Sequence, residues 1–105
     1  MNKKMYALFD KQVKTYMNPI HFINDAEAIR WFTTCVNDKQ KTNVSLYPQQ
    51  FILMLVGVYD DEKGQFANEQ LELVHGNQVQ EEKVQYTIED MIQTILDKEK
   101  GGKLQ

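Results

Sequence analysis

The feature that most restricts the fold of this chain is a continuous apolar segment near its middle. Residues 51–59 are apolar at odd and even positions alike, apart from Gly57. A strand with one solvated face alternates apolar and polar residues, whereas a strand covered on both faces is apolar throughout. The segment is also far shorter than the roughly 20 residues that a membrane-spanning helix needs. The sequence therefore predicts an inner β-strand with protein on both of its faces, and no membrane span.

Two segments near the start of the chain have the pattern of a β-hairpin. Residues 4–10 alternate, with Met5, Ala7 and Phe9 on one side, which is the two-residue period of a strand. Residues 16–23 form a second apolar stretch, which is interrupted by Pro19. Because proline lacks a backbone N–H, this second strand is expected to lie at a sheet edge or to begin after Pro19.

A second hairpin is predicted after the inner strand. Residues 60–64 end in Gly64 and have the composition of a tight turn. Residues 65–66 and 70–74 then supply the last strand. The side chains expected to face the core are Leu71, Leu73 and either Phe66 or Val74.

Two helices complete the pattern. Asn24 followed by acidic residues is a helix-capping signature, and the apolar residues after it recur at helical spacing, which predicts a helix over 25–37. Residues 87–90 repeat the capping signature, and apolar residues recur at helical spacing from Ile88 to Leu96. These two features predict the second helix. The polar residues 38–50 are predicted to form a surface loop anchored by Val44, Leu46 and Tyr47, and residues 76–86 are predicted to form a linker.

These elements predict a single α+β domain. Its order is β-β-α-β-β-α, with a mostly antiparallel four-stranded sheet and two helices. Residues 1–75 form the core, and residues 76–105 form a polar linker and a C-terminal amphipathic helix of the same domain. Two helices can cover both faces of the sheet only if one packs on each side. If both pack on one side, a partner chain must bury the other face, so we expect a homodimer.

Charge and cysteine content restrict the class of function. The net charge is −3, but residues 1–50 carry +3 and residues 51–105 carry −6. The total argues against binding nucleic acid through bulk positive charge, although the first half can still present a basic face. A single cysteine, Cys35, forms no internal disulfide, and the start of the chain lacks the apolar stretch of a secretion signal. The expected location is therefore a reducing cytoplasm.

Catalytic and metal-binding patterns are absent from the sequence. His21 and His75 have no further ligands at zinc spacing, and Cys35 falls on the apolar face of the first helix without a base nearby. The acidic residues 60–62 lack the spacing of a calcium loop, and the glycines do not form a phosphate-binding loop. We therefore expect no enzyme, no metal and no cofactor.

Aromatic and basic residues in the first half are the candidate site. Single-stranded nucleic acid needs aromatic faces for stacking and cations for its backbone. The candidate contacts are Lys3, Lys4, Tyr6, Lys14, Arg30, Trp31, Lys39 and Lys41, with Lys11, Tyr16 and Tyr47 as further members. The alternative is structural: Tyr6, Tyr16 and Trp31 then pack in the core or at a dimer contact, and the lysines only solvate the surface.

Several segments together resemble a known phage family. They are residues 6–10 (YALFD), Tyr16 and Pro19, residues 24–32 (NDAEAIRWF) with 36–37, and residues 53–60 (LMLVGVYD) with Gly64. In order and spacing over residues 4–66, they resemble the small nonstructural protein of microviruses, which are tailless phages with single-stranded DNA genomes, chiefly of the gokushovirus branch. The pattern positions are Asp10, Asn24, Ala28, Arg30, Phe32, Gly57 and Gly64.

The resemblance implies a non-virion protein made in the cytoplasm of the infected bacterium. It implies a role in viral DNA synthesis or in the switch to single-stranded DNA production. One hypothesis is a dimeric accessory protein that binds single-stranded DNA, with Arg30 as the first candidate contact because it faces away from the helix core. The other is a protein-interaction module that regulates a phage or host replication or assembly factor, with the acidic second half as its contact surface.

Overall fold

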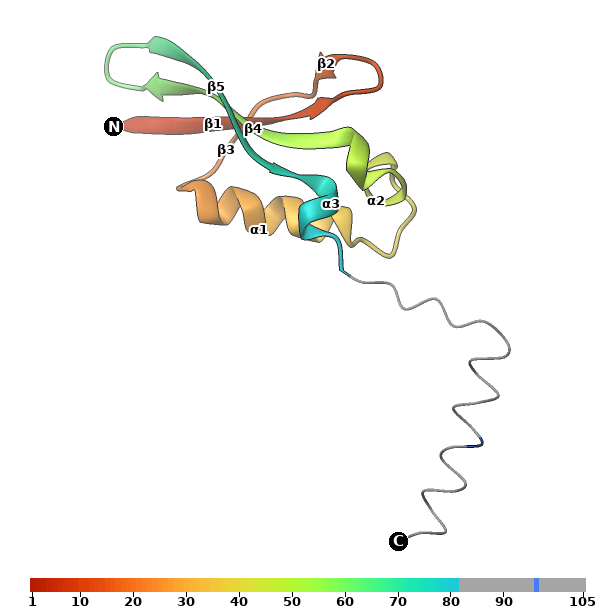
Figure 1. The fold of residues 1–105 in the computed structure, drawn as a ribbon. Coiled ribbons are helices and arrows are strands. Elements are labelled where there is room, and N and C mark those ends of the chain that lie inside the picture. The colour runs from red at the N-terminus through yellow and green to blue at the C-terminus, as the bar shows by residue number, and fades with distance from the viewer. Residues whose placement is uncertain (82–95, 97–105) are drawn as a thin grey trace, which may run out of the picture.

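A computed structural model describes residues 1–81 and residue 96 of the chain. The strands are β1 (Asn2–Asp10), β2 (Thr15–Tyr16), β3 (Ile20–His21), β4 (Phe51–Asp60) and β5 (Gln65–His75). The helices are α1 (Asp25–Val36), α2 (Asn43–Leu46) and α3 (Gly76–Val79), with a 3-10 turn η1 (Pro48–Gln50). The helix predicted to begin at Thr87 lies outside the described residues. Within them, the α+β class is confirmed (Figure 1).

All strand pairs in the sheet are antiparallel, and β4 lies inside it. The strand order is β2-β1-β4-β5, and β3 pairs with β1 beside β2. The predicted place of residues 51–59 inside the sheet is confirmed, because β4 pairs with β1 on one side and β5 on the other. The predicted cover on both faces holds for residues 51–55, which are all buried, and fails at Tyr59, which is exposed. The sheet has five strands where four were predicted, since the stretch around Pro19 separates β2 from β3.

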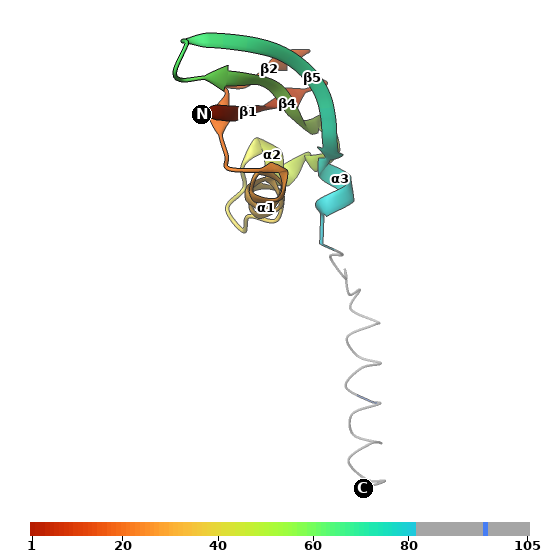
Figure 2. The same cartoon turned by 90° about the vertical axis from the view of Figure 1, so that its left-hand side faces the viewer.

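The helices α1, α2 and α3 lie on the same side of the sheet (Figures 1 and 2). On that side, Tyr6 and Leu8 of β1 and Leu53 of β4 are buried in the hydrophobic core. The opposite side of the sheet is not covered by any helix of residues 1–81. We call it the open face. Which of the two predicted arrangements applies depends on the helix predicted from Thr87, which lies outside the described residues.

Helix α1 forms as the sequence predicts. The side chain of Asn24 accepts a hydrogen bond from the backbone N–H of Glu27 at 2.9 Å, which caps the helix N-terminus. Ala28, Phe32 and Val36, each four residues apart, are its buried residues and pack on the sheet. The helix ends at Val36, one residue before the predicted end.

The segment predicted as a loop over residues 38–50 contains two short helical turns. The Thr42 hydroxyl accepts from the N–H of Ser45, and the Ser45 hydroxyl accepts from the N–H of Thr42, which together cap α2. Of the three predicted anchors, only Val44 is buried, whereas Leu46 and Tyr47 are exposed. The prediction missed α2 because local hydroxyl capping stabilises a helical turn within a polar sequence.

The start of the predicted linker packs on the core. Residues 76–79 form α3, and Gly76 lies directly against the backbone of Pro48. The Asn37 side chain then donates a hydrogen bond to the Val79 carbonyl at 2.9 Å and accepts one from the N–H of Glu81 at 2.8 Å. The packed core therefore extends to residue 81, beyond the boundary predicted at residue 75.

Candidate nucleic-acid interface

The six predicted cations do not share a face of the molecule. Lys3 and Lys4 point to opposite sides of β1: Lys4 pairs with Asp25 at the start of α1 (3.4 Å), and Lys3 pairs with Asp61 in the β4–β5 turn (3.7 Å). Arg30 is exposed on the outer side of α1, where it pairs with Glu27 at 3.7 Å. The remaining three, Lys14, Lys39 and Lys41, lie in the β1–β2 turn and in the exposed loop after α1. A single basic surface is therefore not formed by these residues.

Tyr6 and Trp31 belong to the core, as the structural alternative expected. Tyr6 is only 1% exposed, and its hydroxyl donates a hydrogen bond to Asp25 at 2.5 Å. Burial and this carboxylate raise the pKa of the Tyr6 phenol well above its ordinary value. Trp31 is partly buried and packs against Phe22 with their rings 5.3 Å apart. A fully buried ring cannot stack on a base, so Tyr6 is not available as a contact, whereas Trp31 is partly exposed where it packs against the core.

The Tyr6 hydroxyl gives a direct test of this assignment. Tyr6→Phe should lower the free energy of unfolding by about 1–2 kcal/mol, because a hydrogen bond to a charged acceptor at the start of α1 is lost. Tyr47→Phe is the matched control, since Tyr47 is exposed and should change stability little. Urea denaturation followed by circular dichroism measures both. Equal midpoints for Tyr6→Phe and the unaltered protein would contradict the assignment.

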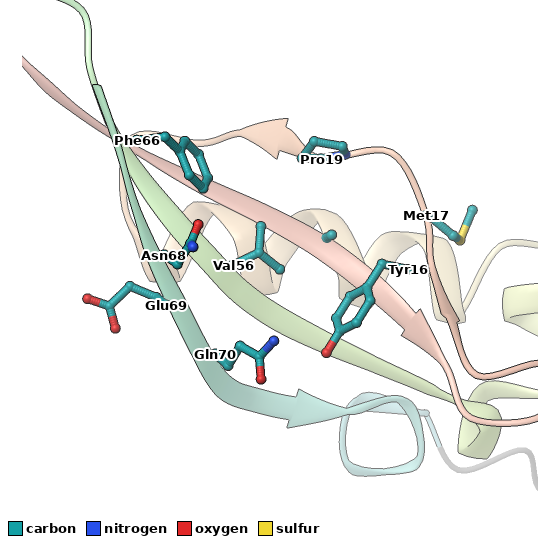
Figure 3. Close-up of a pocket in the computed structure, with 9 residues that line it drawn as sticks. Tyr16, Met17, Pro19, Val56, Phe66, Asn68, Glu69 and Gln70 are labelled. Atoms are coloured by element: carbon teal, nitrogen blue, oxygen red, sulfur yellow. The ribbon is translucent and has the colours of Figure 1, made fainter. Parts of the chain in front are cut away.

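A groove of about 710 Å³ crosses the open face of the sheet. Its floor is Ala7 of β1 and Val56 of β4, and its walls come from β5 on one side and the β2–β3 segment on the other (Figure 3). The lining residues are Ala7, Tyr16, Met17, Pro19, Val56, Phe66, Asn68, Glu69 and Gln70. Glu69 points outward from β5, whereas Gln70 lies over the groove (Figure 3). The groove is thus an apolar floor with aromatic and amide side chains around it.

Local backbone irregularities position the aromatic side chains. At the β1–β2 turn, Lys14 adopts a positive φ of 58°, and the chain then returns so that Tyr16 packs on Phe9 with their rings 4.7 Å apart. At the other end, the Phe66 ring lies over Gly57, where a β-carbon would come within 2.2 Å of the ring. Tyr16 and Phe66 nevertheless remain 46% and 48% exposed.

A row of residues across three strands extends this surface. Lys3 is opposite Tyr59, and Tyr59 is opposite Phe66, so the three side chains lie on the same face of the sheet. Tyr59 is also exposed. The sequence pattern did not single out Tyr59, and it left Phe66 and Val74 as alternative core residues. Val74 is the one of these two that packs on the core. The register of β4 against β5 determines which of these side chains face the core, and residue type alone does not predict that register.

Charges of both signs lie at the two ends of the groove. Lys11 and Lys14 precede Tyr16 in the β1–β2 turn, and Lys63 precedes Phe66 in the β4–β5 turn. None of these three takes part in the ion pairs formed within residues 1–81. The N-terminal ammonium, which donates a 2.7 Å hydrogen bond, holds the pKa of the Asp61 carboxyl below its ordinary value, with a smaller contribution from Lys3. Lys3 is therefore partly neutralised.

Other kinds of site have no support among the described residues. No three His, Cys, Asp or Glu side chains of residues 1–81 lie close enough to hold a metal ion. Cys35 is partly buried, and burial raises the pKa of its thiol, the reverse of what a nucleophile needs. None of the helices described is long and apolar enough to cross a membrane.

Comparison with known proteins identifies the family. The family described as phage ORF5 protein matches residues 3–80, which cover the helices and strands of the described core except the first residue of β1. The chain belongs to the phage ORF5 protein family. It is 32% identical over 69 residues to protein ORF5 of Chlamydia phage 1, a gokushovirus of the microvirus family, over 63% of this chain and 72% of that relative. No solved structure matches it. The resemblance to microvirus proteins is thus confirmed.

Proposed function

We propose that this ORF5-family protein is a non-enzymatic accessory protein of phage DNA synthesis that binds single-stranded DNA on its open face. It acts in the cytoplasm of the host bacterium, during DNA synthesis or the switch to single-strand production, and works as a homodimer. The observation that carries the proposal is the set of exposed aromatic side chains Tyr16, Tyr59 and Phe66 beside a groove on the uncovered side of the sheet.

The open face suits single-stranded more than duplex DNA. Every unpaired base has a π-face that stacks on an aromatic ring regardless of sequence, and recognition of single strands by aromatic side chains on a sheet is a recurrent arrangement. Asn68 and Gln70 line the same groove, and their amides can both donate hydrogen bonds to and accept them from base edges. A paired base inside a duplex has both of its faces covered by neighbouring bases and leaves only its groove edges accessible.

The aromatic contacts can be tested with a labelled oligo-dT of about 12 nucleotides, a length within the usual site size of single-strand binders. Phe66→Ala and Tyr16→Ala should each weaken binding by roughly 5- to 150-fold, because one stacked base contributes about 1–3 kcal/mol. Tyr47→Ala is the matched control, since Tyr47 is equally exposed but lies outside the groove. Fluorescence anisotropy measures the affinities, and identical values for all three variants would end the proposal.

The placement of the cations predicts the salt dependence. With Lys11, Lys14 and Lys63 as phosphate contacts, the logarithm of affinity should fall with the logarithm of salt concentration at a slope of about −2, following the rule of about −0.7 per phosphate on single strands. Lys14→Ala should reduce that slope, and Arg30→Ala should leave it unchanged because Arg30 lies on the helix side. A larger effect of Arg30→Ala than of Lys14→Ala would move the site to the helix side of the sheet.

A second candidate function is a protein-interaction module. Residues 60–62 place three acids beside the aromatic row of the open face, and the net charge of −3 disfavours a polyanion. This candidate predicts recovery of one stoichiometric phage or host replication or assembly protein from infected cells after nuclease treatment. It also predicts that Phe66→Ala abolishes that recovery while oligo-dT binding is undetectable for every variant. Retention of DNA with no protein partner would exclude it.

A further inference from the structure

Among the described residues, strand β5 has a long backbone edge that pairs with no other strand. Within residues 1–81, β5 pairs with β4 alone, and its residues 65–72 are all exposed. The opposite edge of the sheet differs, because the short strands β2 and β3 cover β1 there. An unpaired edge presents a row of N–H and C=O groups that pair readily with another strand.

The exposed part of β5 has few of the features that keep sheet edges apart. Proteins block such edges with lysine, proline or a run of charged side chains. Residues 65–72 contain no lysine and no proline, and Glu69 and Glu72 are their two charged residues. The remaining side chains are amides, Ala67, Phe66 and Leu71, which pair with one another without electrostatic repulsion.

We infer that two copies of this chain pair through β5, antiparallel, about a twofold axis that stands perpendicular to the sheet and passes midway between Asn68 and its copy. The inference rests on the homodimer of the proposed function and names its interface. It gives a continuous sheet that runs through both copies, with both open faces on the same side.

Symmetry and charge select the register. Opposed residues of antiparallel strands share a face, so an axis perpendicular to the sheet must pass midway between one residue and its own copy. The exposed part of β5, residues 65–72, has its midpoint between Asn68 and Glu69. The axis is therefore centred on one of these two residues. An axis at Glu69 would oppose two carboxylates, whereas an axis at Asn68 opposes two amides and sets Glu69 against Ala67 of the other copy.

This pairing completes the groove of the open face. Phe66, Asn68 and Gln70 line the wall of the groove that β5 forms. In the register centred on Asn68, Phe66 of one copy lies opposite Gln70 of the other. Each copy therefore adds an aromatic ring and an amide next to its partner's groove, and the two grooves form one longer track. A single strand of DNA could then follow both copies without crossing to another face.

Disulfide trapping tests the register. In a Cys35→Ala background, Asn68→Cys should form a covalent dimer in high yield on mild oxidation, because directly opposed residues have β-carbons about 4.5–5.5 Å apart. Gln65→Cys is the matched control on the same exposed strand. In this register, Gln65 and its copy are offset by six residues, or about 20 Å at roughly 3.3 Å per residue, so it should remain uncrosslinked. Equal yields for the two variants would overturn the register.

Mass measurement separates this inference from the proposed dimer. The unaltered protein should have twice its monomer mass of 12.4 kDa in sedimentation equilibrium, and Asn68→Lys, which opposes two ammonium groups, should shift it to the monomer. Gln12→Lys, in the exposed β1–β2 turn, should stay dimeric. A dimer that Asn68→Lys leaves intact would refute the β5 interface alone. A monomer at all concentrations would refute both the interface and the dimer, whatever the result for DNA.

Discussion

Gly76→Ala should lower the free energy of unfolding by about 3 kcal/mol or more. A β-carbon at Gly76 would lie 2.0 Å from the Pro48 carbonyl oxygen and 2.7 Å from its carbon. Both atoms belong to the backbone of η1, so no side-chain rotation can relieve the overlap. Overpacking in a closely fitted site costs about 1–3 kcal/mol when neighbours adjust and more when they cannot. The start of α3 must then separate from η1.

Asn77→Ala is the matched control for this substitution. Asn77 is the next residue of α3 and is exposed, so the added or removed atoms meet solvent, and a change within about 0.5 kcal/mol is expected. Urea unfolding followed by circular dichroism compares the two variants. If Gly76→Ala were as stable as Asn77→Ala, the packing of α3 against η1 would be wrong, and with it the extension of the core to residue 81.

The elements that could be predicted from the sequence are those whose burial is set by residues close together in the chain. The apolar residues of β4 occur without interruption, and Ala28, Phe32 and Val36 recur every four residues after a capping Asn24. The first pattern is typical of a strand that lies between two others in a sheet, and the second follows from a helix with one covered face. This is why the inner strand and α1 were predicted within one residue.

The candidate site depended on contacts between distant residues, which no local pattern encodes. Tyr6 and Trp31 have the residue types of a stacking surface, but Tyr6 reaches Asp25 nineteen positions away and becomes buried. Phe66 was a possible core residue until its register opposite Tyr59, on the face away from the helices, was known. Similarly, the lysines were close in sequence number, yet alternate residues of β1 point to opposite faces of the sheet.

Phe32→Ala should cause a loss of about 3–5 kcal/mol in the free energy of unfolding. Phe32 is fully buried at 0% exposure, among Tyr6, Leu53 and other core side chains, so the substitution removes a large apolar contact and leaves a cavity that the sheet cannot fill. Ile23→Ala is the matched control, since Ile23 is 81% exposed and immediately precedes the α1 cap. It should change stability by no more than about 0.5 kcal/mol.

A second variant keeps this test informative if Phe32→Ala does not fold. Small domains are stable by only about 5–15 kcal/mol, so the alanine variant can fall below the threshold for purification. Phe32→Leu retains most of the volume and should cost about 1–1.5 kcal/mol. The order of stability must therefore be Ile23→Ala, then Phe32→Leu, then Phe32→Ala. A Phe32→Leu variant as stable as Ile23→Ala would mean that α1 does not rest on the sheet through Phe32, and the assignment of the core to the helix side of the sheet would be wrong.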